Sequence, residues 1–221
     1  MSPALTIFLW GLAFLATHHI PVHPPVRKAL IGVLGERAYL VLYSLLSFAT
    51  LLPWVSVWWK NRHAGPLLWD LRGVPGLTHI VELGVVLAFA LMVGGALTPA
   101  PSSHLYRGKA IGVRGVVAIT RHPLMMGIGL WAACHALVNG WAGDLAFFGL
   151  FALSAWGGAW HQDLRKTEAN PAYAEFKEKT SFFPWPTPSA LAAVGARGWI
   201  TMGMGAFLAV VVRMFHPFLF G

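Results

Sequence analysis

Histidine is the residue type whose number and placement in this sequence most need explanation. Ten histidines occur in a chain of 221 residues that is 57% hydrophobic and only 11% charged. An ionisable side chain inside lipid is costly and usually faces a partner or a cavity. Two groups of side chains therefore stand out as candidates for chemistry. They are His18, His19 and His23 with Arg27, and Arg121 with His122 and His135.

Any metal centre in this chain has to rely on imidazole. Cys134 is the single cysteine and no CxxCH motif is present, which excludes a disulfide framework, a cysteine-ligated iron–sulfur cluster and covalently attached haem. Two neutral imidazoles from different helices suit an embedded haem iron better than zinc, which normally takes four protein ligands, or three and a water. The alternative is that each histidine only donates a hydrogen bond between helices.

The spacing of the second group limits which histidines can act together. His122 and His135 are thirteen positions apart, which at about 100° per residue places them on different faces of a straight helix. Each therefore needs a partner from another helix, and the segment that contains His18 is the histidine-rich candidate. Arg27 and Arg121 lie at a suitable depth to pair with haem propionates.

The histidines lie in or beside long stretches that contain no Asp, Glu, Lys or Arg. Such stretches indicate that lipid surrounds these parts of the chain. The charged fraction of 11% is far below the roughly 25% of a soluble domain. Backbone groups in lipid must be paired within the chain, and the stretches lack the alternation of barrel strands, so helices are expected. The sequence predicts an all-α, polytopic membrane bundle of about six transmembrane helices in a single domain, 1–221. The predicted helices cover residues 3–20, 38–59, 78–98, 122–139, 142–160 and 199–219.

Basic residues predict which side of the membrane each connection faces. With six helices, the first, third and fifth connections hold twelve Lys and Arg residues and the second holds three. Short cytoplasmic loops are enriched in these residues, so both termini are expected on the periplasmic side of a bacterial inner membrane. The net charge of +8 then indicates contact with membrane lipids and not with nucleic acid, because the charge is scattered through short loops. The twelve are Arg27, Lys28, Arg37, Arg107, Lys109, Arg114, Arg121, Arg165, Lys166, Lys177, Lys179 and Arg197, and the three are Lys60, Arg62 and Arg72.

Two further features lie outside the histidine groups. The polar segment 161–197 contains Asn170-Pro171, a good start for a short helix, and is expected to lie on the cytoplasmic membrane surface with Tyr173 and Phe176 on its apolar face. Glu82 and Arg213 are expected at matching depths, where they form a buried ion pair or snorkel separately to the interface.

A series of motifs that covers most of the chain resembles one protein family. The motifs are Thr17-His18, Arg27, Gly35-Glu36-Arg37-Ala38-Tyr39, Tyr43-Ser44-Leu45, Arg114-Gly115, Thr120-Arg121-His122-Pro123 and Ala133-Cys134-His135-Ala136-Leu137-Val138-Asn139-Gly140. In this order they resemble the NnrU family. That family is associated with nitric oxide and nitrite metabolism in denitrifying bacteria, and it is similar to plant and cyanobacterial zeta-carotene isomerases, which use haem b.

The resemblance implies haem b with His18 and His135 as axial ligands. In our hypothesis Arg121 and His122 shape the inner rim of the pocket, and Arg27 is a further cation near it. The predicted helices raise one difficulty, because His18 lies within ~5 Å of the inner boundary and His135 lies ~18 Å beyond the start of its helix. Trans ligands of one iron must lie at similar depth. The choices between His135 and His122, and between His18 and His19, therefore stay open.

A more distant likeness is to isoprenylcysteine methyltransferases, through Arg-His-Pro and a later Tyr-x-x-Phe/Tyr-Lys, here Tyr173 to Lys177. Those enzymes hold S-adenosylmethionine with an acidic pair, and residues 161–166 contain no such pair. The leading hypothesis is thus a haem-dependent isomerase of an apolar polyene or a haem protein of nitrogen-oxide metabolism. The alternatives are a membrane methyltransferase and a non-catalytic accessory to nitrogen-oxide enzymes.

Overall fold

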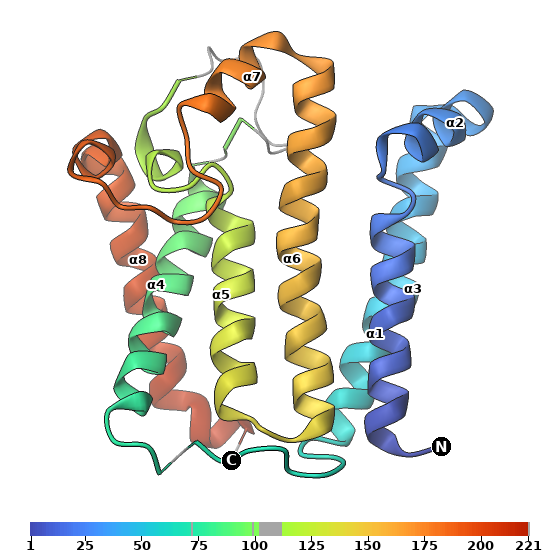
Figure 1. Ribbon diagram of the computed structural model, residues 1–221, viewed down its shortest axis with the longest axis vertical. Helices are drawn as coiled ribbons and strands as arrows, with labels where there is room; N and C mark the ends of the chain where they lie inside the picture. Colours follow the sequence, from blue (N-terminus) through green and yellow to red (C-terminus); the bar gives the residue numbers. More distant parts are fainter. Residues whose placement is uncertain (72, 99, 102–111, 221) are drawn as a thin grey trace. The chain divides into compact units, whose positions relative to one another are not determined.

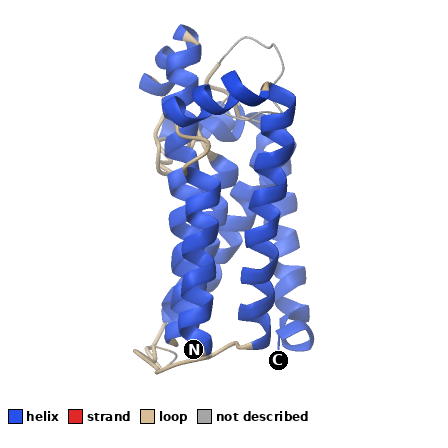
Figure 2. Cartoon of the chain, turned by 90° about the vertical axis from the view of Figure 1, so that its right-hand side faces the viewer, coloured by secondary structure: helices blue, strands red, loops and turns tan. Residues whose placement is uncertain are grey.

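The computed structural model describes residues 1–71, 73–98, 100–101 and 112–220, and in this part of the chain it is helical without any strand (Figure 2). Three of the basic residues counted above, Arg72, Arg107 and Lys109, lie outside the described residues. The α-helices are α1 (Pro3–His19), α2 (Pro24–Leu34), α3 (Glu36–Lys60), α4 (Leu77–Leu97), α5 (Pro123–Val138), α6 (Ala142–Ala169), α7 (Pro171–Glu178) and α8 (Pro188–Phe220), with a 3₁₀ turn η1 (Gly115–Ala118) before α5 (Figure 1).

All six predicted helices are present, and the all-α membrane architecture is confirmed. By length and composition α3, α4, α6 and α8 can each cross a membrane, and α1 and α2, which meet at a bend of 70°, make a fifth span if they are counted together. The sixth, α5, has 16 residues and is about 24 Å long, short of the ~30 Å hydrocarbon layer. The described structure thus has four to five candidate spans, where the sequence predicts about six.

Lipid as the solvent also explains which side chains the helices expose. Large apolar side chains on α3 and α8 are uncovered, with Leu45 at 61% and Phe207 at 71% exposure. In water such surfaces would be unfavourable, and in hydrocarbon they are ordinary.

Contacts divide the described chain into two compact units. Unit 1 comprises Met1–Thr78 and Ala132–His161, and unit 2 comprises His79–Trp131 and Gln162–Gly221. The prediction of a single domain over 1–221 stays a prediction.

In unit 1, α1 packs against α3, and the helices come close because of Gly11 (Figure 1). A Cβ atom at Gly11 would lie 2.5 Å from Leu150 Cδ1 and 2.9 Å from the Trp54 ring. Trp54 is completely buried at this crossing. Gly35 separates α2 from α3 with a φ of 78°, a conformation that glycine adopts without strain.

In unit 2, α7 begins as predicted, because the Asn170 side chain accepts a hydrogen bond from Ala172 N at 3.0 Å. The prediction that its apolar face lies on the membrane surface is corrected by packing within the unit. Tyr173 and Phe176 are 1% and 2% exposed and form a cluster with Val117 and Ala100. The apolar face of α7 is therefore covered by protein.

The ion pair between Glu82 and Arg213 forms, also within unit 2, but it is not buried. Arg213 Nε lies 3.0 Å from Glu82 Oε1, and the two side chains are 62% and 41% exposed. His79 adds a longer contact to Glu82, at 3.8 Å. The matching depths of the two residues are thus correctly predicted, and the burial is wrong, because α4 and α8 present this pair on their outer faces.

We predict that Gly11→Val lowers the free energy of unfolding of the protein in mild detergent by about 1–3 kcal/mol, since the added methyl groups overpack the buried Trp54. Circular dichroism during chemical denaturation measures this change. Gly32→Ala is the matched control, because no heavy atom lies within 4 Å of a Cβ there. Equal stability of the two variants would show that the close approach at Gly11 is not required.

Candidate functional site

Arg121 and His122 are held in unit 2 by a single carboxylate. Asp163 Oδ2 accepts hydrogen bonds from Arg121 Nε at 2.8 Å and Nη2 at 2.7 Å, and Oδ1 accepts from His122 Nε2 at 2.7 Å and from the Tyr173 hydroxyl at 2.7 Å. The side chains of Asp163, His122 and Arg121 are 3%, 0% and 10% exposed. A buried charge with four donors around it is well compensated, and it fixes the rotamers of all its partners.

Backbone pairing places these side chains. Arg121 N donates to Ser181 O at 3.0 Å and Arg121 Nη1 donates to Thr180 O at 2.8 Å. Trp185 N donates to Ile119 O at 2.9 Å, so the chain after α7 runs beside the chain before α5. His122 stands directly before Pro123, where the proline disfavours helix and α5 begins.

The two ring nitrogens of His122 have different surroundings in this arrangement. Because a carboxylate oxygen accepts, Nε2 carries a hydrogen and donates to Asp163, and within the described part of the chain the buried Nδ1 has no hydrogen-bond partner. The ring edge of Phe182 covers His122 at a centroid distance of 5.5 Å.

Sequence reasoning missed the anchoring role of Asp163 and of Tyr173. A single aspartate near the end of an apolar helix was available as a signal, since an ionisable residue there needs a partner. The sequence does not show that Arg121, His122 and Tyr173 are all partners of the same carboxylate, because their separations from Asp163 range from 10 to 42 positions.

His18 lies in the last turn of α1, in unit 1, between polar groups of α3. Its Nδ1 lies 2.9 Å from the Tyr43 hydroxyl and 3.3 Å from Ser47 Oγ, and its ring stacks on Phe14 at 5.0 Å. The Tyr43 hydroxyl is farther from Nε2, at 3.4 Å. The ring is therefore oriented mainly through Nδ1.

Three more histidines gather next to His18. His19 Nδ1 lies 3.3 Å from His161 Nδ1, and His19 Nε2 lies 3.1 Å from Ser154 Oγ. The rings of His23 and His161 meet edge to face at 5.6 Å, and those of His18 and His19 at 5.4 Å. Gly157, on α6, has no side chain and so leaves room for the His19 ring of α1. The predicted group at residues 18–23 is thus real, and His161 is a member that the sequence analysis missed.

His135 also belongs to unit 1, but it packs at another level of α6. Its ring lies 5.0 Å from the ring of Phe148, whereas His19 contacts Ser154, Gly157 and His161. Phe148 and Ser154, the nearer of these positions, are six residues apart, which is about 9 Å along a helix. His135 and His19 therefore contact different turns of α6, and the pairing of His18 with His135 stays a prediction.

Arg27, near the histidine group, forms an ion pair with Glu36. Its Nη2 lies 3.2 Å from Glu36 Oε1, and its guanidinium stacks over the Tyr39 ring at 5.4 Å. The Tyr39 hydroxyl donates to Pro21 O at 3.0 Å and fixes the turn after α1. Within the described residues, no group of three or more His, Cys, Asp or Glu side chains is arranged to hold a bare metal ion.

The fold and these side chains define a multi-pass helical membrane protein with a histidine cluster in unit 1 and a buried, carboxylate-centred network in unit 2. The chain belongs to the NnrU protein family, whose model matches residues 6–221. This match confirms the resemblance found in the sequence motifs.

Two curated proteins are similar to the chain. The chloroplastic 15-cis-zeta-carotene isomerase of Arabidopsis thaliana is 28% identical over 165 residues, which cover 69% of this chain and 42% of the relative. The enzyme of the same name from Zea mays is 26% identical over 172 residues, which cover 72% of this chain and 44% of the relative. The chain thus spans less than half the length of these relatives. No solved structure matches it.

We predict that Asp163→Asn lowers the free energy of unfolding by about 3–5 kcal/mol, because it leaves the buried Arg121 without its counter-charge. Chemical denaturation in detergent measures the loss. Glu175→Gln is the matched control, since it removes an exposed ion pair with Lys179, which is worth little. A loss for Asp163→Asn no larger than that for the control would contradict the anchoring role.

Proposed function

We propose that the protein is a haem b-dependent membrane protein that isomerises an apolar polyene such as zeta-carotene by redox-type chemistry. The support for isomerisation is the distant similarity to two 15-cis-zeta-carotene isomerases, which extends over about 70% of this chain. The support for haem is the resemblance of the motifs around His18 and His135 to the haem-binding positions of those isomerases.

The environment of His18 is the observation that carries the proposal. A histidine that binds a metal usually has its other ring nitrogen held by a polar partner, which fixes the ring orientation. Tyr43 and Ser47 hold Nδ1 of His18 in this way, and Phe14 covers one face of the ring. The residues present therefore fit one imidazole ligand of an embedded haem.

The second ligand is a separate question. His135 is the position that the resemblance implies, and it contacts Phe148 of α6, six residues or about 9 Å before Ser154, which contacts the neighbour of His18, His19. His19 and His161 lie closer to His18, and His122 is the remaining candidate of the sequence analysis.

The chain's own side chains would orient and enclose the reacting groups. Bound haem would supply one-electron chemistry that weakens the double-bond character of a polyene. Tyr43 and Ser47 hold the imidazole of His18, and Arg27 provides a cation near the helix end for a propionate, although Glu36 already pairs with it. An apolar substrate would reach such a site from the membrane, where the exposed leucines and phenylalanines of the helices also lie.

The same redox site would serve a role in nitrogen-oxide metabolism, with which the family is associated. A methyltransferase is less well supported, because Asp163 binds both Arg121 and His122, the two side chains that would have to hold the methyl donor. In each case we propose the bacterial inner membrane as the location, with both termini on the periplasmic side.

Purified protein in mild detergent, supplied with haemin and then reduced, tests the haem proposal. We predict a Soret band that His18→Ala abolishes, and that His135→Ala also abolishes if His135 is the second ligand. If His135→Ala keeps the Soret band, Ala variants of His19, His122 and His161 are measured in the same way, and loss of the band identifies the second ligand. His79→Ala is the control, because its side chain is 88% exposed. A folded wild-type protein that retains no haem after free haemin is removed refutes haem dependence and favours the accessory role.

If haem binds, the reaction is tested by adding 15-cis-zeta-carotene in detergent under reducing conditions and separating the isomers by chromatography. We expect conversion that His18→Ala eliminates. Haem binding without conversion would favour nitrogen-oxide chemistry over isomerisation.

A further inference from the structure

The helix α2 connects α1 to α3 in unit 1, and the proposed function assigns its surface no role. It follows α1 after a short turn and ends directly before α3, and α1 and α3 pack against each other. In Figure 1 α2 lies where both helices end, and it is bent by 70° from α1. Because α1 has 17 residues and is about 26 Å long, the turn after it reaches the boundary of the ~30 Å hydrocarbon layer. α2 therefore begins close to the lipid headgroups.

α2 separates its apolar and basic side chains onto two faces. Val26, Leu30 and Val33 occupy positions i, i+4 and i+7, which lie on one side of a helix. Lys28 and Gly32 lie on the opposite side, since Lys28 is two positions, or about 200°, from Val26. No residue of α2 is buried, and the side chain of Val33 is 85% exposed. This distribution is typical of a helix that lies in the membrane interface.

Contacts with α3 hold α2 in its orientation. Arg27 Nη2 lies 3.2 Å from Glu36 Oε1, and the guanidinium lies over the Tyr39 ring at 5.4 Å. The Tyr39 hydroxyl donates to Pro21 O at 3.0 Å and so fixes the turn before α2. A helix that is held in place before it meets its partner loses less conformational entropy on binding.

Two basic side chains at this end of unit 1 have no ion pair with any described acidic residue. Glu36 pairs with Arg27, whereas Lys28 on α2 and Arg37 in the first turn of α3 are both exposed. Their charges are therefore available for an anion. Basic side chains beside an apolar helix face attract the anionic lipids of a membrane surface.

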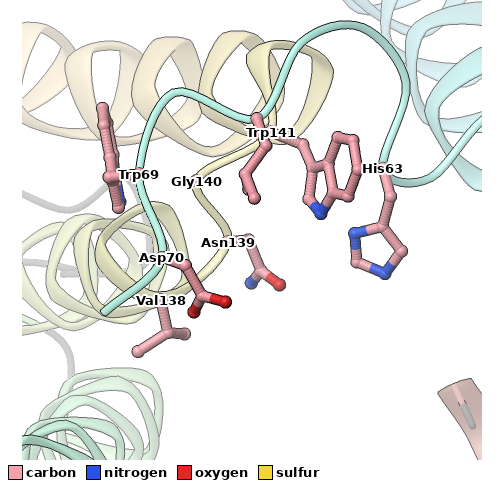
Figure 3. A pocket seen from close by; sticks show the side chains of 8 residues that line it. His63, Trp69, Asp70, Val138, Asn139, Gly140 and Trp141 are labelled. Carbon is pink, nitrogen blue, oxygen red and sulfur yellow. The ribbon is translucent and has the colours of Figure 1, made fainter. Parts of the chain in front are cut away.

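The opposite end of α3 is built differently. The chain after Lys60 is bonded to the start of α6 and the residues before it, because Leu68 N donates to Gly140 O at 2.8 Å and His63 Nδ1 lies 2.7 Å from the buried Asp144 carboxylate. Figure 3 shows this loop alongside the chain that joins α5 to α6. That connection is held by protein contacts, so Lys60 provides a basic residue for comparison.

We propose that α2 lies in the interface between hydrocarbon and headgroups, and that Lys28 and Arg37 bind the phosphate of an anionic phospholipid. Val33 and Leu34, which are 85% and 41% exposed, then enter the acyl region. The two cations favour an anionic lipid over a zwitterionic one, and the apolar face beside them favours a lipid over a water-soluble anion. This role does not depend on haem.

Spin labels on two neighbouring residues test the position of α2. Gly32→Cys and Val33→Cys place a nitroxide on the basic and on the apolar side, and at Gly32 no heavy atom lies within 4 Å of a Cβ. In lipid nanodiscs we expect dissolved oxygen to relax the label of Val33→Cys more, and a water-soluble nickel chelate to relax that of Gly32→Cys more. Wild-type protein, whose single cysteine Cys134 is buried, gives the labelling background. Equal access of the chelate to both labels overturns the proposal.

Titration of the full chain in maltoside micelles with phosphatidylglycerol tests the class of lipid, with a bimane fluorophore on Val33→Cys as the reporter. We expect tighter binding than for phosphatidylcholine, and affinity about five-fold weaker in Lys28→Gln and in Arg37→Gln, the usual effect of one basic side chain near an anionic surface. Lys60→Gln is the matched control, because it removes the same charge at the other end of α3.

Three results would contradict this assignment. Equal affinity for the two lipids overturns it, as does unchanged affinity in both Lys28→Gln and Arg37→Gln. Glycerol phosphate carries the same phosphate without acyl chains and should not compete. Competition at the concentration of the lipid would assign the two cations to a water-soluble anion instead.

Discussion

A polar side chain away from water must find its partner inside the protein, and this constraint organises both units. In hydrocarbon the backbone satisfies it by forming helices, which accounts for the all-helical structure of the described chain. Side chains satisfy it in pairs and networks. Asp144 and Asp163 are both almost completely buried, and each accepts three or more hydrogen bonds from groups far apart in the sequence.

The two aspartates perform different tasks with the same chemistry. Asp144, in the first turn of α6, lies 2.7 Å from the ring of His63, a loop residue with an unfavourable φ of 62°. It thereby stabilises the loop that follows α3. Asp163, near the other end of α6, connects the Arg-His-Pro motif to the tyrosine of α7. An apolar helix with a carboxylate close to each end can therefore position two sets of functional side chains.

Helix positions were predictable from the sequence because apolar runs of about 20 residues admit few other structures in lipid. The six predicted helices agree with the observed ones, and Asn170-Pro171 correctly marks the start of α7. The helix α2 was missed, because its basic residues and two prolines resemble a loop. Depth along the bundle was predictable for Glu82 and Arg213, which form an ion pair at 3.0 Å.

Partners of side chains were much harder to predict, since they depend on how helices rotate against each other. The sequence marks His18 and His19 as candidates but does not show that His161 faces them across α1 and α6. It places Glu82 and Arg213 at one depth, while their exposure depends on which face of α4 turns outward. The role of His63 could not be predicted, because the strain in its backbone has no signature in the residue type.

The hydrogen bonds around Asp163 have a mechanical consequence. Residues near the end of α6, in α7 and directly before α5 meet at one carboxylate, and the chain segments before α5 and after α7 are hydrogen-bonded to each other. A displacement of the end of α6 would therefore either carry the imidazole of His122 with it or break its hydrogen bond to Asp163, and both changes would alter the surroundings of His122 Nδ1.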